Sequence, residues 1–230
     1  MFQFQLKNQN VSIDDSKYGI EALLAYGMEE PHCFHLMFVL DDCMKARACA
    51  MRAELATKLQ IPKDQIVVIT KEQLICQTKK GDLYCWYLRQ SCKIIYHKSN
   101  FIKELLNCQI PRPNMEFETK SVIQFVDNSM QLYRQKRLNC YAMLAILAEG
   151  IGDLGEHVCI RHGSFVFHKK NAVEKCFHCS DVTLPFTYQQ YCVLYKYWCS
   201  YKENQTLPRP MLVDLAVDEW YQAFCKFAKC

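Results

Sequence analysis

The chain has 230 residues, of which 50% are hydrophobic, 13% aromatic and 23% charged. This composition is typical of a globular protein and excludes an intrinsically disordered or collagen-like chain. The apolar runs are short and carry charges at both ends, so we expect no membrane-spanning helix and no membrane partner. The net charge of +4 is small and evenly spread, which argues against an obligate nucleic-acid binder with one strongly basic face.

Cysteine is unusually frequent, with 15 residues. An odd number cannot pair completely within one chain, and the first residues lack the basic head and long apolar run of a signal peptide. We therefore expect a reducing, cytoplasmic compartment, in which most cysteines act as small buried hydrophobic residues.

The first half alternates between strand-like and helix-like patterns. The expected elements are a buried strand over 33–40, an amphipathic helix over 43–59, a strand over 66–69, a helix over 83–89 and a strand over 92–96. This order predicts an α/β layer built on a small sheet.

Two prolines, Pro111 and Pro113, stop a helix and favour an extended linker, so we place a domain boundary there, between 1–112 and 113–230. The second half has helical periodicity almost to its end. Its expected helices contain the stripe Val122, Val126, Met130 and Tyr133, then 138–156, 188–199 and 213–227. The prediction is an α+β fold: a small mixed sheet with helices, followed by an all-α helical bundle.

The segment from Asp82 to Tyr96 reads as a short helix ending in Leu-Arg, followed by a turn and an Ile-Ile-Tyr strand. It resembles the end of a minimal nucleotidyltransferase domain of the polymerase β-like superfamily, and the preceding strand–helix–strand order is also similar to that family. Residues 163–173 resemble a Gly-to-Lys turn in the HEPN-like helical domains that follow such enzymes. The resemblance covers about two thirds of the chain and implies a nucleotidyltransferase fold with a substrate cleft between its two domains.

The chemical motifs of that family are absent. Such enzymes hold triphosphate on a Gly-Ser turn and bind magnesium with two aspartates at alternate positions of the next strand. Here Gly27 is followed by Met28, and Cys33 and His35 occupy the alternate strand positions, although Mg²⁺ prefers hard oxygen ligands. The third acidic position would fall in 65–69, which contains no carboxylate.

Asp41 and Asp42 could replace the missing aspartates. Adjacent residues on a strand point to opposite faces, however, so they cannot form the usual pair unless the strand has ended. We interpret them as a strand end that leads into a helix N-terminus, where an acidic residue suits the helix dipole.

We therefore expect a catalytically degenerate, nucleotidyltransferase-like binding module. Its degenerate nucleotide pocket would contain Gly27, Cys33, His35, Asp41 and Asp42, and its ligand would be a nucleotide, RNA or a protein partner. The aromatic-rich helical domain would supply the protein-binding face, and a homodimer is a further possibility. The alternative is an active enzyme that transfers a nucleoside monophosphate with Mg²⁺ as cofactor, using carboxylates at Asp41, Asp42, Glu29 or Asp153.

Two further patterns lie in the second half. A cationic surface of Arg161, His162, Lys169 and Lys170 could contact phosphate groups. The spacing of Arg161 and His168 also resembles the loose Arg-His pattern of HEPN ribonucleases, which the resemblance implies would cut RNA across a dimer interface.

The remaining patterns involve cysteine and histidine. Cys176, His178 and Cys179 form a C-x-x-C motif with an extra histidine. One interpretation is a structural zinc site completed by upstream ligands, and the other is a loop with buried thiols. The upstream candidates are His157, Cys159, His162 and His168. Cys33 and His35 share a strand face and could be a nucleophile and its base, but we favour a core role.

Overall fold

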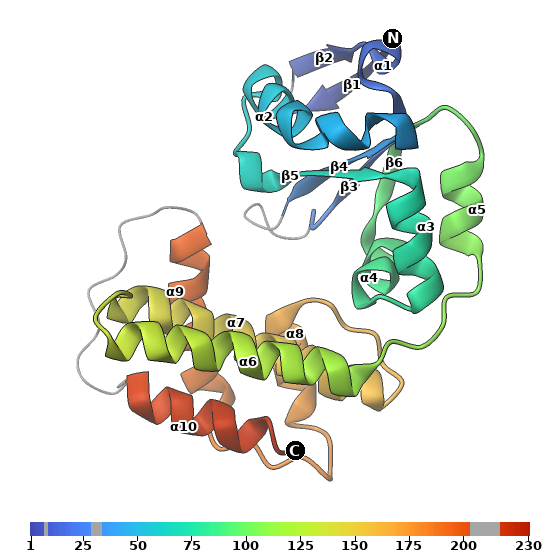
Figure 1. Cartoon of the computed structure of the whole chain (residues 1–230). Helices are drawn as coiled ribbons and strands as arrows, with labels where there is room; N and C mark the ends of the chain where they lie inside the picture. The colour runs from blue at the N-terminus through green and yellow to red at the C-terminus, as the bar shows by residue number, and fades with distance from the viewer. Residues whose placement is uncertain (7–8, 29–33, 203–216) are drawn as a thin grey trace. The chain divides into compact units, whose positions relative to one another are not determined.

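The computed structural model describes residues 1–6, 9–28, 34–202 and 217–230 (Figure 1). The chain divides into two units, Met1–Pro113 and Asn114–Cys230. The first contains two β-sheets with helices and the second, where it is described, contains helices alone, so the predicted α+β class is confirmed. None of the described helices combines the length and the apolar character that crossing a membrane requires.

The first unit is built on a four-stranded mixed sheet in the order β5-β4-β3-β6. Its strands are β3 (Ile20–Tyr26), β4 (His35–Leu40), β5 (Ile66–Thr70) and β6 (Lys93–His97). Strand β3 pairs antiparallel with β4 and β6, while β4 pairs parallel with β5. A parallel pair needs a crossover connection, which here contains helix α2 (Ala48–Leu59).

Both faces of this sheet are covered, which explains why β3 and β4 are apolar on both sides. Helix α2 and the hairpin of β1 (Phe2–Leu6) and β2 (Gln9–Ile13) pack on one face. The other face carries three helices: α3 (Lys71–Lys80), α4 (Leu83–Ser91) and α5 (Phe101–Asn107). Residues alternate between the two faces, so that Leu36 and Phe38 face the hairpin and Met37 and Val39 face the three helices.

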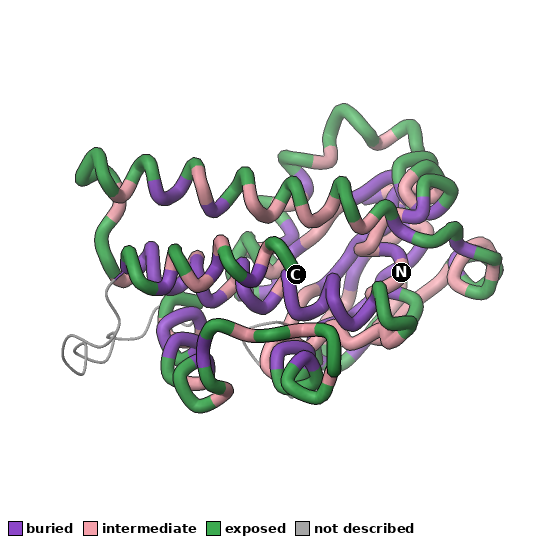
Figure 2. The backbone as a smooth tube through the Cα atoms, turned by 90° about the horizontal axis from the view of Figure 1, so that it is seen from below, coloured by how far each residue is buried: buried purple, intermediate pink, exposed green. Residues whose placement is uncertain are grey.

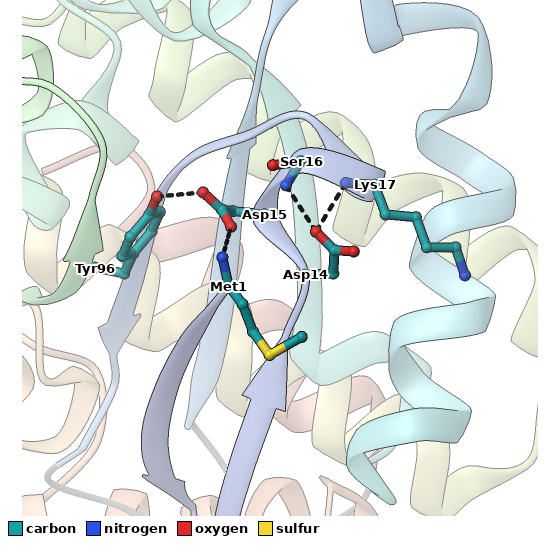
Figure 3. Close-up of polar contacts among 6 residues, drawn as sticks. All are labelled: Met1, Asp14, Asp15, Ser16, Lys17 and Tyr96. Carbon is teal, nitrogen blue, oxygen red and sulfur yellow. Dashed lines mark hydrogen bonds and ion pairs between the residues drawn. The ribbon is translucent and has the colours of Figure 1, made fainter.

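The hairpin is fixed to the edge strand β6 by polar contacts, which Figure 3 shows, and by one ring stack. Asp15, at the start of helix α1 (Asp15–Tyr18), accepts hydrogen bonds from the Met1 ammonium group and from the Tyr96 hydroxyl, the latter at 2.8 Å. These two donors hold the pKa of Asp15 at about 2. The rings of Phe2 and Tyr96 stack at 3.9 Å, so strand β1 is held above β6.

The second unit is arranged around one central helix, α7 (Cys140–Arg161), of whose 22 residues sixteen are buried. Four helices pack against it: α6 (Met115–Arg134), α8 (Lys169–Cys176), α9 (Tyr188–Lys202) and α10 (Val217–Phe227). In Figure 2 buried stretches alternate with exposed turns along the outer helices, as amphipathic helices require. The aromatic stripes of α9 and α10 contribute Tyr191, Trp198, Trp220 and Phe224 to this core, whereas Val213 lies outside the described residues.

Two expectations need correction. The helix expected over 43–59 begins only at Ala48, because Asp42–Arg47 forms a 3-10 helix with Asp41 at its N-cap. Most cysteines are not buried: of the fourteen described, none in a disulfide bond, only Cys85, Cys159 and Cys176 are buried, and five are exposed. The cysteine side chain is small and only weakly polar, so it can also stand at helix ends and on outer helix faces without filling a place in the core.

Candidate functional site

The turn between β3 and β4 is where the resemblance implies a nucleotide pocket. Gly27 follows β3 with a φ of +68°, a left-handed conformation that favours glycine. Tyr26 and His35 are cross-strand partners, so their side chains lie on the same face, the one covered by α3, α4 and α5. Cys33 lies outside the described residues.

Aromatic rings occupy this face beside the turn. The rings of Tyr26 and His35 are stacked, 5.1 Å apart and tilted by only 5°. Tyr84 and Tyr87 of α4 meet Tyr26 edge-on, each at 5.7 Å, and the Tyr84 hydroxyl donates a 2.6 Å hydrogen bond to the Tyr26 hydroxyl. We call Tyr26, His35, Tyr84 and Tyr87 the aromatic cluster.

The cluster carries little negative charge at neutral pH. Burial raises the pKa of Tyr26 to about 12 and raises the pKa of Tyr84 well above its ordinary value, so both phenols stay protonated. On the neighbouring strand, Val67 is the partner of Met37 and packs on the same face, where the third acidic position would fall. The described residues hold no group of three His, Cys, Asp or Glu side chains placed to bind a metal ion.

Asp41 and Asp42 are not brought to this turn. They follow Leu40, the last residue of β4. At the usual rise per residue, Leu40 lies about 17 Å along the strand from His35. Asp41 accepts a hydrogen bond from the Cys43 amide at 3.1 Å, and such bonds from Cys43 lower its pKa. Asp42 accepts a 2.7 Å bond from the Glu72 amide at the start of α3. Both carboxylates therefore stabilise helix N-termini.

The second unit does not gather its four candidate phosphate contacts on one free surface. Lys169 is turned inward: its aliphatic carbons lie against Gly152, where an added Cβ would clash with them, and its ammonium pairs with Asp153. Burial alone would lower the pKa of Lys169, but the carboxylates of Asp153, Glu156 and Glu149 raise it above its ordinary value. Lys169 and Asp153 thus neutralise each other inside the bundle.

The other candidates lie at helix ends. Arg161, at the end of α7, is exposed and donates to the Cys230 carbonyl at 3.5 Å. His162 pairs with Asp181 at 3.3 Å, and Lys170 is half-buried in the first turn of α8. His168 accepts the Asn171 amide hydrogen as the N-cap of α8, so Arg161 and His168 do not share a helix.

Of the cysteine motif, only Cys176 faces the protein interior. The Cys176 thiol is buried and donates to the Gly155 carbonyl at 3.6 Å, and the upstream Cys159 thiol donates to the Ala172 carbonyl at 3.5 Å. His178 is exposed. The two thiols therefore help to pack α8 against α7.

Sequence reasoning missed the aromatic cluster. Tyr84 and Tyr87 are three residues apart in a segment expected to be helical, so they share a helix face, and that spacing was the available signal. Their contact with Tyr26, 58 residues away from Tyr84, depends on the packing of α4 on the sheet. No protein-family model matches the chain, and no curated protein matches it significantly.

Proposed function

We propose that the protein is a nucleotidyltransferase-fold binding module that engages its ligand without a two-metal centre. The connectivity of the first unit supports this proposal. Strand β4, helix α2 and strand β5 follow one another in the strand–helix–strand order on which the resemblance rests, and β4 and β5 pair parallel.

The observation that carries the proposal is the ring stack of Tyr26 and His35 beside the turn. A pair of magnesium ions needs several carboxylate oxygens on one strand face, but this face presents a phenol and an imidazole instead. The stack and the hydrogen bond from Tyr84 fill the position with packed side chains.

The ligand in this proposal is a nucleotide or RNA, or a protein partner bound through the helical unit. Three large apolar side chains on the outer part of α6 support a protein-binding face, since such residues are usually covered: Phe117, Phe125 and Leu132 are 64%, 50% and 40% exposed. A second copy of the chain is one such partner. The absence of a disulfide bond among the fourteen described cysteines supports a reducing, cytoplasmic compartment.

Calorimetric titration of the full chain with ATP, in EDTA and then in excess Mg²⁺, tests the proposal. We expect the ATP affinity to be the same in both buffers if a nucleotide is bound, and no heat of binding if the module serves a protein partner. An affinity that rises tenfold or more with Mg²⁺ contradicts the proposal and favours the active enzyme.

A double variant at Asp41 and Asp42 strengthens this experiment. Replacing both Asp41 and Asp42 by asparagine removes the only described carboxylates proposed as substitutes in the first unit while keeping their shape. Because both lie at the far end of β4, nucleotide binding should be unchanged. Loss of Mg²⁺-dependent binding in this variant would assign the metal to these residues.

A further inference from the structure

A hollow of about 780 Å³ lies in the first unit, on the face of the sheet opposite the aromatic cluster. Its floor includes Ala25 of β3 and Leu36 of β4, and strand β1 of the hairpin covers it with Phe4 and Leu6. The volume is in the usual range for small-molecule sites, roughly 300–1,000 Å³. The hollow is open to solvent on one side, so a ligand can reach it.

The hydrogen-bonding register explains the hollow. Ala25 is the cross-strand partner of Leu36 on one side and of Lys93 on the other, and Leu36 pairs with Ile66. Cross-strand partners share a face, so these four side chains form one row across the sheet. Alanine is the smallest member and stands in the middle of the row, which leaves space beneath β1.

Charge sets the chemistry of the opening. Lys93 lines the hollow and is exposed, and within the described part of the chain no carboxylate forms an ion pair with it. Among the described residues that line the hollow, Lys93 is the only charged one, and Gln5 and Gln65 are the other polar ones. A nucleoside triphosphate carries several negative charges and would need more cations than this one lysine supplies.

We propose that the hollow binds an amphiphilic carboxylate, such as a medium-chain fatty acid. Its alkyl chain lies over Ala25 and Leu36, and its carboxylate accepts hydrogen bonds from the Lys93 ammonium. The contacts of Asp15 and Phe2 with Tyr96 hold the hairpin over the sheet, so the hollow is largely formed before the ligand arrives. This site is independent of the nucleotidyltransferase proposal, since it uses the opposite face of the sheet.

Calorimetric titration of the full chain with dodecanoate, below its critical micelle concentration, tests the proposal. Dodecanol serves as the uncharged analogue and AMP as a competing class of ligand. Lys93→Gln should weaken dodecanoate binding roughly tenfold, because a charge-assisted hydrogen bond is lost, and should leave dodecanol binding unchanged. Lys103→Gln, at an exposed lysine of α5 outside the hollow, should leave both unchanged.

Ala25→Leu tests the hollow itself. The larger side chain should fill the space and abolish binding of dodecanoate and dodecanol, with circular dichroism confirming that the variant is folded. The proposal is overturned if wild-type protein does not bind dodecanoate, if AMP binds in the hollow instead, or if a folded Ala25→Leu protein binds dodecanoate as the wild type does. Equal effects of Lys93→Gln on dodecanoate and dodecanol would also overturn it.

Discussion

The hydroxyl of Tyr26 lies inside the first unit, where the Tyr84 hydroxyl is its hydrogen-bond donor at 2.6 Å. Tyr84→Phe keeps the ring contacts but removes this donor. We expect the free energy of unfolding to fall by about 1–2 kcal/mol, because a buried polar group loses its partner. Urea denaturation measures the change, and Tyr201→Phe, at a tyrosine that is 52% exposed, is the control. Equal stability of the two variants would contradict the packing of the aromatic cluster.

In the second unit the buried polar side chain to test is Glu156, which lies close to Lys169. Burial raises its pKa to about 8, from 4.5 in an exposed carboxyl group, and the Lys169 ammonium opposes this shift. Between these two pH values the folded protein holds a proton that the unfolded chain has released. The stability of the wild type should therefore fall as the pH rises through this window.

Glu156→Gln removes the titrating group while keeping its size. Relative to the wild type, the variant should gain stability from about pH 4.5 upward and reach a plateau above pH 8, with a total on the order of 5 kcal/mol. Thermal unfolding across this pH range measures it, with the exposed Glu219→Gln as control. Parallel pH profiles for Glu156→Gln and the wild type would show that the carboxyl group is ionised in the folded protein.

At the scale of elements, two helices are followed by a glycine in the left-handed conformation, one with close neighbours and one without. Gly81 follows α3 with a φ of +72°, and a Cβ there would lie 2.6 Å from the Pro111 carbonyl oxygen. Gly163, after α7, has a φ of +77° and nothing within 4 Å of the Cβ position. Gly163→Ala should cost about 1 kcal/mol through backbone strain alone, and Gly81→Ala should cost at least twice as much. Comparison of the two by chemical denaturation tests the contact of Gly81 with Pro111 and Arg112, and similar losses would refute it.

Asp42 joins the end of β4 to the first turn of α3. Asp42→Ala should lower stability by about 1 kcal/mol, because the Glu72 amide loses an acceptor and the helix N-terminus loses a negative charge. Asp42→Asn keeps an acceptor oxygen and should recover part of the loss. Hydrogen exchange at the amides of the first turn of α3 reports the effect, and unchanged protection in Asp42→Ala would contradict the capping role.

Over the whole molecule, the strongest periodic patterns predicted the elements best. The long apolar segment of α7 and the aromatic stripe of α9 were expected as helices, and the strands over 33–40, 66–69 and 92–96 correspond to β4, β5 and β6. The β1–β2 hairpin was missed, although Phe2 to Leu6 alternates apolar and polar residues. Helix α3 was missed because its composition is polar, yet Thr70 and Gln73 form a capping box and Gly81 ends it.

The candidate sites were harder to predict because they depend on distant contacts. The inward turn of Lys169 requires Gly152 to leave space, seventeen positions earlier in the chain. The aromatic cluster requires α4 to pack against Tyr26 at the end of β3. Neither requirement can be read from local periodicity, and the same holds for the bond from the Glu72 amide to Asp42. The capping role of Asp41, by contrast, follows from its place between a strand and a helix.

The most direct test of the central claim is to measure where a divalent cation binds, if it binds at all. Mn²⁺ replaces Mg²⁺ and broadens the NMR signals of nearby amides, so ¹H–¹⁵N spectra of the full chain with ATP and substoichiometric Mn²⁺ locate any such site. We predict no selective broadening at Gly27, His35 or Val67. Selective loss of these three signals, reversed by excess Mg²⁺, would contradict the account and establish a metal site at the β3–β4 turn.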